Sequence, residues 1–424
     1  MENNYHLKED HLKENHLEEM LSRYVGHGPY LVIDGEKYID TASGTFNLPL
    51  GYTNHRIAEK LKQQIDRCTH LSSAYTREMS QYILSKLVKH TPKGIDSIWL
   101  RDVSGSGAVE CAIRIAQKAT GRSGIVSFFL AHHGQSLATA QVSGNAFRLK
   151  NFHINIEGSI KIPAPSSVMA EPPDEATQYI DLEQFIQLGS SDNIACLIIE
   201  PIQGNGGNIV FPVEFYRKIR EICHQHGIII IADEVQTGFG RTGTFFASTG
   251  YAKELEPDII VFAKGAGGIG IPIGGVLMRS SLDVLESFEH SSTSGANPLS
   301  LVALNEIIDI IEDEHILENV RQNETFLRNG LLDLQHKYPE ITGVRGIGYM
   351  FGFDTPSPEF AARAIAVANY HKLILRGSRY GKGRALKIRP PLICTQVHLN
   401  EILHKLDLTF AELTVSAQGH REVA

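Results

Sequence analysis

The sequence predicts an α/β fold with two parts. We expect a large domain, at residues 56–298, whose mostly parallel central sheet is flanked by helices. We expect a smaller α+β domain built from both ends of the chain, at residues 23–55 and 299–415. Two observations support this prediction: apolar runs of about five residues alternate with helical segments, as in parallel sheets buried on both faces, and after Asn297-Pro298 the pattern changes to long helices and short β runs.

Length, charge and cysteine content narrow the class of protein. A chain of 424 residues can bury a large core, and its net charge of -8 gives no reason to expect nucleic-acid binding. No apolar run approaches about 18 residues, and the N-terminus is too charged for a secretory signal, so we expect a soluble cytoplasmic protein without a membrane partner. The five cysteines are scattered and have no CxxC spacing, which favours free thiols.

The two ends of the chain are expected to be peripheral. Residues 1–22 form an N-terminal helical or flexible extension with an imperfect five-residue repeat that begins at His6, His11 and His16. A period of five rotates around a helix, so the three histidines do not share a face, and a solvated helix is favoured over a metal site. The polar residues 416–424 are expected to be a disordered tail.

The elements between these ends follow from apolar spacing and turn residues. Two β runs around Asp34-Gly35 predict a hairpin at residues 30–40. In the large domain we predict helices and strands in turn, namely helical segments at 56–89 with a break at Tyr75-Thr76, 108–116 and 212–226, and strands at 97–100, 125–128, 195–199, 228–232, 259–263 and 273–278. In the small domain we predict helices up to 338, broken near Asp313, and at 360–370 and 400–413, with β runs at 341–344, 349–353 and near Leu386.

A glycine-rich turn joins the first large-domain strand to its helix. Val103-Ser104-Gly105-Ser106-Gly107 lies between the two. Such an arrangement points free backbone N–H groups and the helix dipole at a phosphate. Gly/Ser turns before helices are common, so this motif indicates a phosphate site only together with its neighbours.

Two charged side chains, Asp233 and Lys264, follow neighbouring buried strands. In open α/β sheets ligands bind at this end of the strands. A carboxylate and an amine there fit pyridoxal phosphate (PLP), which needs an anion against its protonated ring nitrogen and a lysine for an imine. Taken singly, such an Asp is more often a turn or cap residue and such a Lys a surface group. The pair, downstream of a Gly/Ser helix start, favours the cofactor.

This pair would give the site its chemistry. The aldehyde cofactor, joined to Lys264 as an imine until the substrate amine takes its place, makes the Cα–H of that amine acidic, provided that the ring nitrogen keeps its proton. Asp233 would keep that proton in place. Once displaced by substrate, Lys264 is a free amine beside the Cα and can act as general base and acid.

Several segments together resemble the class III aminotransferases of PLP fold type I. These are Ile230 to Gly243 (IIADEVQTGFGRTG), Glu200 to Gly204, Lys264 to Pro272, Thr293 to Pro298 and Arg389 to Leu392. The look is closest to the ectoine-type diaminobutyrate aminotransferases. The resemblance implies a homodimer with the active site at the subunit boundary, and it implies the following roles: Lys264 forms the imine, Asp233 contacts the pyridine nitrogen, Gln236 the ring hydroxyl and Val235 a ring face, Gly105 and Ser106 form the phosphate turn, and Thr293 reaches the phosphate from the partner subunit.

The sequence departs from the family pattern at four positions. His132 stands where an aromatic residue usually stacks on the cofactor, and Gly107 replaces a glutamate of the phosphate turn. Lys387 replaces the arginine that grips a substrate carboxylate, and lysine matches a carboxylate less well. Asn205 replaces the glutamate that masks that arginine, and Arg389, on the same strand face as Lys387, is the alternative cation.

We therefore expect an aminotransferase that moves an amino group between a primary, terminal amine and an oxo-acid such as 2-oxoglutarate. The altered carboxylate site favours a second substrate without a free α-carboxylate, for instance a diamine or the carbonyl of a larger biosynthetic intermediate, carrier or peptide. Two alternatives stay open: a decarboxylase or epimerase of the same fold, and a PLP-binding partner protein without catalysis. No metal is expected.

Overall fold

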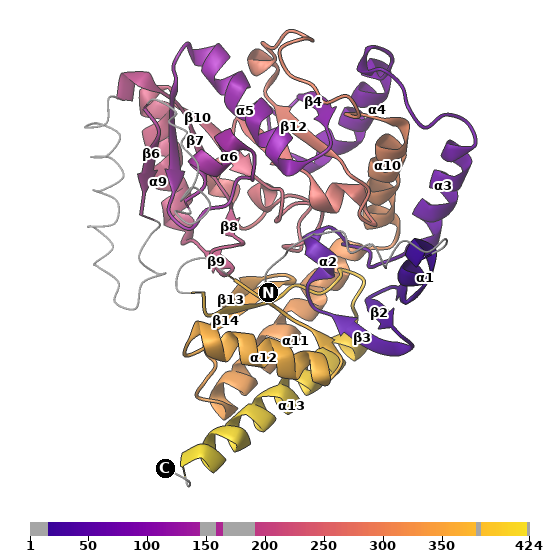
Figure 1. The fold of residues 1–424 in the computed structure, drawn as a ribbon. Helices are drawn as coiled ribbons and strands as arrows, with labels where there is room; N and C mark the ends of the chain where they lie inside the picture. The colour runs from indigo at the N-terminus through magenta and orange to yellow at the C-terminus, as the bar shows by residue number, and fades with distance from the viewer. Residues whose placement is uncertain (1–15, 145–157, 164–190, 379–382, 422–424) are drawn as a thin grey trace.

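The computed structural model describes residues 16–144, 158–163, 191–378 and 383–421, and it contains a seven-stranded sheet in its larger part (Figure 1). The strand order is β4-β12-β11-β10-β7-β5-β6. All neighbours are parallel except at β12, which runs antiparallel to both β11 and β4. The mostly parallel sheet is confirmed, and its strands are β4 (Ser97–Asp102), β5 (Gly124–Phe128), β6 (Ile160–Ile162), β7 (Ile194–Ile199), β10 (Ile229–Asp233), β11 (Ile259–Phe262) and β12 (Gly274–Met278).

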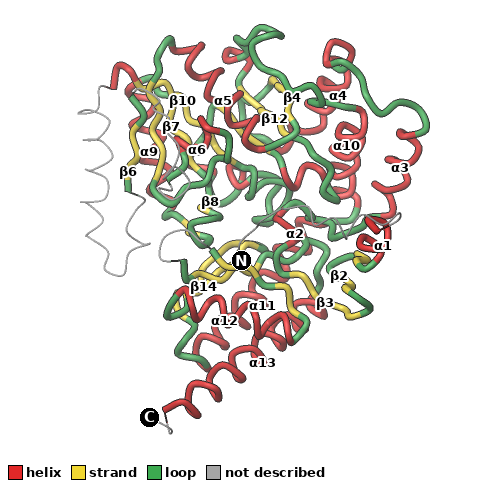
Figure 2. The backbone as a smooth tube through the Cα atoms, viewed as in Figure 1, coloured by secondary structure: helices red, strands yellow, loops and turns green. Residues whose placement is uncertain are grey.

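Helices cover both faces of this sheet, and Figure 2 shows the helices of the described residues in red and the strands in yellow. Successive side chains of a strand point to opposite faces. Accordingly Ile229 and Ile231 of β10 pack in one apolar cluster with α5 (Gly105–Thr120), and Ile230 packs in another with α9 (Val213–His226). This two-sided burial explains why the central strands are apolar throughout.

The smaller part contains two four-stranded sheets, β1-β2-β3-β15 and β13-β14-β17-β16. The predicted hairpin is present, and β15 pairs in parallel with β3, so the two ends of the chain share one sheet. The strands are β1 (Tyr24–His27), β2 (Tyr30–Ile33), β3 (Glu36–Asp40), β13 (Thr342–Ile347), β14 (Met350–Asp354), β15 (Leu373–Ile374), β16 (Arg376–Gly377) and β17 (Ala385–Ile388). A two-stranded ribbon, β8 (Ile202–Gln203) with β9 (Ile209–Val210), lies between β7 and α9 in sequence.

The long helices of the smaller part are α11 (Ile316–Lys337), α12 (Pro358–Tyr370) and α13 (Gln396–Arg421), and α2 (Ser43–Phe46) is a single turn. The end of α13 differs from the prediction, because the helix continues past residue 413 into the segment expected to be a disordered tail. Residues 411–418 include no Gly or Pro, and adding residues to a formed helix is far easier than starting one. At the other end α1 (His16–Ser22) is described, but most of the His-Leu repeat lies outside the described residues.

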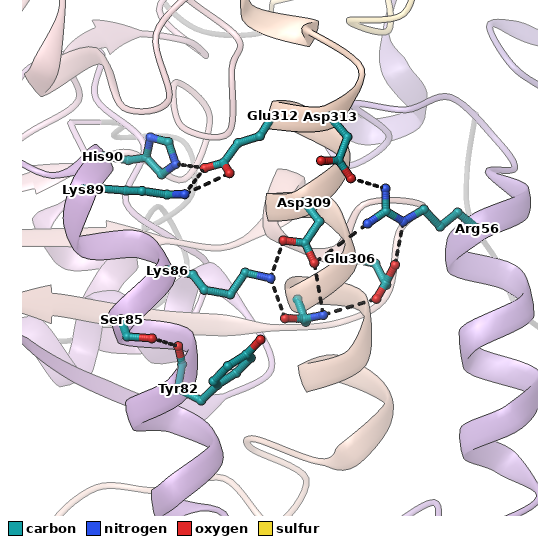
Figure 3. Close-up of polar contacts among 11 residues, drawn as sticks. Arg56, Tyr82, Ser85, Lys86, Lys89, His90, Glu306, Asp309, Glu312 and Asp313 are labelled. Atoms are coloured by element: carbon teal, nitrogen blue, oxygen red, sulfur yellow. Dashed lines mark hydrogen bonds and ion pairs between the residues drawn. The ribbon is translucent and has the colours of Figure 1, made fainter.

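Ion pairs fasten α10 (Pro298–Asp313) to α3 (His55–Ile65) and to α4 (Arg77–Leu87) with the turn that follows it (Figure 3). The acidic side chains of α10 are spaced about one turn apart, so they share a face. The pairs are Arg56 with Glu306, Asp309 and Asp313, Lys86 with Asp309, and Lys89 and His90 with Glu312. In the described part of the chain, no helix combines the length and apolar character that a membrane span requires.

Candidate active site

A cavity of about 320 Å³ lies where β10 and β11 end and α5 begins. It has the size of a small-molecule site. The predicted cofactor residues Gly105, Ser106, His132, Asp233, Val235, Gln236 and Lys264 all line it. Thr45 and Asn47 of the N-terminal segment complete one wall.

Lys264 lies two residues after the end of β11 and adopts an unusual backbone conformation with φ +41°. A left-handed backbone at a long side chain is uncommon and typically strained. Burial lowers the pKa of Lys264 to about 8, and Asp233 and Glu200 oppose that shift by attracting the charged form. Near neutral pH the amine therefore loses its proton more readily than an ordinary lysine.

Asp233 is the last residue of β10, and its carboxylate is held from two sides. His133 Nδ1 lies 2.8 Å from Asp233 Oδ2, and the backbone N–H of Val235 donates to Oδ1 at 3.1 Å. An ionised carboxylate can only accept, so Nδ1 carries the proton of this imidazole. These two contacts hold the carboxylate of Asp233 in one orientation at the cavity.

The Gly/Ser turn forms the start of α5, as predicted. Ser104 caps the helix, since its Oγ accepts from the N–H of Gly107 at 3.2 Å. The first N–H groups of a helix have no acceptor within the helix, and Gly105 and Ser106, which provide them, line the cavity. The turn can therefore bind a phosphate through backbone N–H groups and the helix dipole.

Glu200, just past the end of β7, is a buried carboxylate that braces one wall. Its Oε1 accepts from the N–H of His132 at 2.7 Å, and its Oε2 from the N–H of Gly204 at 2.9 Å. Burial raises the pKa of Glu200 to about 7, while the hydrogen bonds from the backbone N–H groups of His132 and Gly204 oppose this rise. Glu200 thus orients the backbone of His132, the residue that replaces the usual aromatic.

The three predicted substrate residues do not line the cavity. Lys387 is buried on β17 with its ammonium 5.1 Å from the ring centre of Phe46, and burial, together with the charges of Arg389 and Lys264, lowers its pKa well below the usual range. Arg389 is fully buried and donates to protein oxygens. Asn205 is half-buried, and its backbone oxygen accepts from Ser378.

Thr293 lies outside this cavity too. It is exposed, in the loop before α10, and it does not contribute to the cavity of its own chain.

Sequence reasoning missed the supporting roles of His133, Glu200 and Thr45. Glu200 had a usable signal, because it follows a buried apolar run just as Asp233 does. His133 has no such local signal, because its contact with Asp233 spans a separation of 100 residues. For Thr45 no pattern in the N-terminal segment predicts a place in the site.

The groups around the cavity fit PLP. An amine with a lowered pKa, a fixed carboxylate and a helix N-terminus are the features that an aldehyde, a pyridine nitrogen and a phosphate require. Val235 packs close to Gly105, and a Cβ added at residue 105 would lie 3.1 Å from Val235 Cγ1.

Comparison with known proteins agrees with this chemistry. The model of the family "aminotransferase class-III" matches residues 15–410. Acetylornithine aminotransferase of Brucella melitensis is 32% identical over 92% of this chain and 93% of its own length. Alanine/serine racemase of Pyrococcus horikoshii is 30% identical over 94% and 87%, and 5-aminovalerate aminotransferase of Pseudomonas putida is 31% identical over 90% and 91%.

Proposed function

The chain belongs to the class III aminotransferases, and we propose that it moves an amino group between a terminal amine and an oxo-acid such as 2-oxoglutarate, with Lys264 and Asp233 as its catalytic residues. The observation that supports these roles is the shared cavity, which brings the amine and the carboxylate together at the ends of β10 and β11. Bound PLP supplies the electron sink that makes the carbon bearing the amino group acidic.

In this proposal each side chain of the site has a definite task. Lys264 moves a proton to and from the reacting carbon, and its lowered pKa makes it a free base at moderate pH. Asp233, fixed by His133, holds the proton on the ring nitrogen. Gly105 and Ser106 bind the phosphate, Val235 and His132 face the ring, and Gln236 binds the ring hydroxyl.

We propose that Lys387 acts on the substrate carboxylate through its charge and not by direct contact, because it does not line the cavity. Lys264, Arg389 and Arg376 add positive charge around it, against the carboxylate of Glu200. Such a site favours an anion, but an ammonium holds a carboxylate without the fixed two-point geometry of arginine. We therefore propose a substrate whose reacting amine lies at the far end from any carboxylate, as in the 5-aminovalerate of one relative's name.

We further propose a homodimer in which Thr293 reaches the phosphate in the partner's site. Thr293 is exposed and absent from the cavity of its own chain. Exposed apolar side chains on α3, on α4 and in the segment between them could be covered by a second copy, namely Ile65, Tyr75, Met79 and Tyr82.

Amine screening by absorbance tests this function. The purified protein with PLP should show a visible band that disappears on adding the right terminal amine, and 2-oxoglutarate should then yield glutamate in equal amount. Lys264→Ala should lack the band and lose at least about 1000-fold in rate.

Each other outcome identifies a different activity. Full activity restricted to ordinary amino acids, through their α-amino groups, would contradict the terminal-amine proposal. Inversion at Cα without amino transfer would favour a racemase, as one relative is named, and CO2 release would mark a decarboxylase. A stable PLP band that no amine alters would indicate a non-catalytic protein.

A further inference from the structure

Arg389 makes a contact that the proposed reaction does not yet use. It follows β17, and only 1% of its surface is exposed. Its Nη1 donates to Gln236 Oε1 at 2.6 Å, and its Nη2 donates to the backbone oxygen of Gly204 at 2.6 Å and to Asn208 Oδ1. The ring of Phe46 covers the guanidinium, with 3.9 Å between the ring centre and Cζ.

These contacts determine which way the amide of Gln236 faces. A guanidinium has donors only, so the amide must turn its oxygen toward Arg389. The NH₂ group of the same planar amide then points away from Arg389. Because Gln236 lines the cavity, the donor is the group left for a ligand there.

We infer that Arg389 is a positioning residue that holds the Gln236 amide with its NH₂ toward the ring oxygen of the cofactor. The inference rests on the proposed function, which places Gln236 at the ring hydroxyl. Without Arg389 the amide could present either atom, and its oxygen would repel an anionic ring oxygen.

Gly204 belongs to the same hydrogen-bond network as Arg389 and Gln236. Its N–H donates to Glu200 and its oxygen accepts from Arg389, so one peptide segment links the supports of His132 and Gln236. A side chain at Gly204 would collide with this arrangement, since a Cβ there would lie 2.1 Å from Gln236 Oε1 and 3.1 Å from Arg389 Nη2.

The alternative role for Arg389, direct capture of a substrate carboxylate, fits the contacts less well. Its terminal nitrogens already donate to protein oxygens, and it does not line the cavity. Its Nε is buried without a partner in the described part of the chain, but that atom lies on the stem of the guanidinium.

The experiment uses the full-length protein and PLP itself as the probe. Arg389→Met, Gln236→Leu and the double variant are compared for PLP dissociation constant, by titrating the cofactor-free protein, and for the pH midpoint of the visible band. A donor to the ring oxygen favours its anionic form, so losing that donor should raise the midpoint. We expect both single variants to raise the dissociation constant about 10-fold, because one hydrogen bond to a charged group is lost.

The double variant distinguishes positioning from general support. If Arg389 acts through Gln236, Arg389→Met should add nothing once Gln236 is Leu. Gly204→Ala keeps Arg389 but displaces the Gln236 amide, so it should also raise the pH midpoint of the visible band. This variant tests the inference even if Arg389→Met does not fold. Arg345→Met is the matched control, since Arg345 donates to the nearby Gly207 oxygen and to Asp354 without touching Gln236.

Two results would overturn the inference. One is an Arg389→Met protein with the midpoint and dissociation constant of the wild type. The other is effects of Arg389→Met and Gln236→Leu that multiply in the double variant. Failure of the wild type to bind PLP would instead contradict the proposed function, so the two failures can be told apart.

Discussion

Burial disfavours the charged form of the Lys264 side chain. The lowered pKa of this side chain predicts how the rate of cofactor uptake depends on pH. An amine reacts with an aldehyde only when neutral, and burial brings the pKa of Lys264 to about 8. The rate of PLP uptake by cofactor-free protein should thus rise about 10-fold per pH unit below that value and level off above it. Stopped-flow absorbance between pH 6 and 10 measures this rate.

The variant Asp233→Asn tests how this carboxylate affects the pKa of Lys264. Asp233 raises the pKa of Lys264, so Asp233→Asn should move the midpoint to lower pH. A rate that keeps rising steeply to pH 10 would mean that Lys264 titrates like an ordinary surface lysine.

The side chain of Asp102 explains why residue 107 is glycine and not the glutamate of the family pattern. A Cβ at residue 107 would lie 2.2 Å from Asp102 Oδ1, and His290 Nε2 holds the same carboxylate at 2.9 Å. Gly107→Ala should therefore cost about 1–3 kcal/mol in the free energy of unfolding, as overpacking does. Urea denaturation measures the loss.

The matched background for this test is Asp102→Ala, which removes the obstructing carboxylate. There, adding Gly107→Ala should cost well under 1 kcal/mol, roughly the scale of a tolerated small substitution. Equal losses in both backgrounds would show that the two residues do not compete for space.

For the residues of the site, the sequence predicts the charged side chains at the ends of buried strands. It predicts few of the side chains that form hydrogen bonds with them. Asp233 and Lys264 are detectable because a charge directly after an apolar run has a local pattern. The contacts of His133 with Asp233 and of Arg389 with Gln236 join residues 100 and 153 positions apart. No local periodicity encodes such a pair, so only the folded chain reveals it.

Among the elements, α10 is attached to α3 by the ion-pair network of Figure 3 as well as by apolar packing. The side chain of Glu306 is nearly buried, and that of Arg56 is 37% exposed. Arg56 Nε lies 2.9 Å from Glu306 Oε2. Arg56→Met should lower the free energy of unfolding by about 1–2 kcal/mol, because a nearly buried carboxylate loses its partner while solvent screens part of the effect. Thermal or urea unfolding at low salt measures this.

Lys62→Met is the control on the same helix. Lys62 pairs with Glu59, and both side chains are exposed, so this change should stay within about 0.5 kcal/mol. Equal effects of the two substitutions would contradict a special role for the network.

Long apolar runs predicted the central strands well, while the shortest elements escaped prediction. Strands β8, β9, β15 and β16 have two residues each, too few for any alternation to appear. The predicted domain boundary at residue 298 also falls at the start of α10, which packs by its acidic face on α3 and α4. The change in composition at Asn297-Pro298 marks the start of α10. The basic side chains that pair with α10 lie more than 200 residues earlier in the sequence.

For the whole molecule, mixed dimers test whether the proposed active site is shared between subunits. Lys264→Ala and Thr293→Glu each disable a different component, the second by placing a negative charge against the phosphate. If Thr293 serves the partner's site, one site of a mixed dimer is wholly wild type, and co-refolding equal amounts should restore about a quarter of wild-type activity. If Thr293 serves its own chain, mixing should restore nothing, and differently tagged chains allow the mixed species to be isolated.

The parallel pairing of β15 with β3 has a consequence for synthesis on the ribosome. One edge of β3 is covered by the hairpin, but the other finds its neighbour only about 330 residues later. At the usual 5–20 residues per second that edge stays open for roughly 20 to 70 s on the nascent chain. Open strand edges are templates for unwanted association, so chaperone dependence should fall most heavily on the N-terminal hairpin.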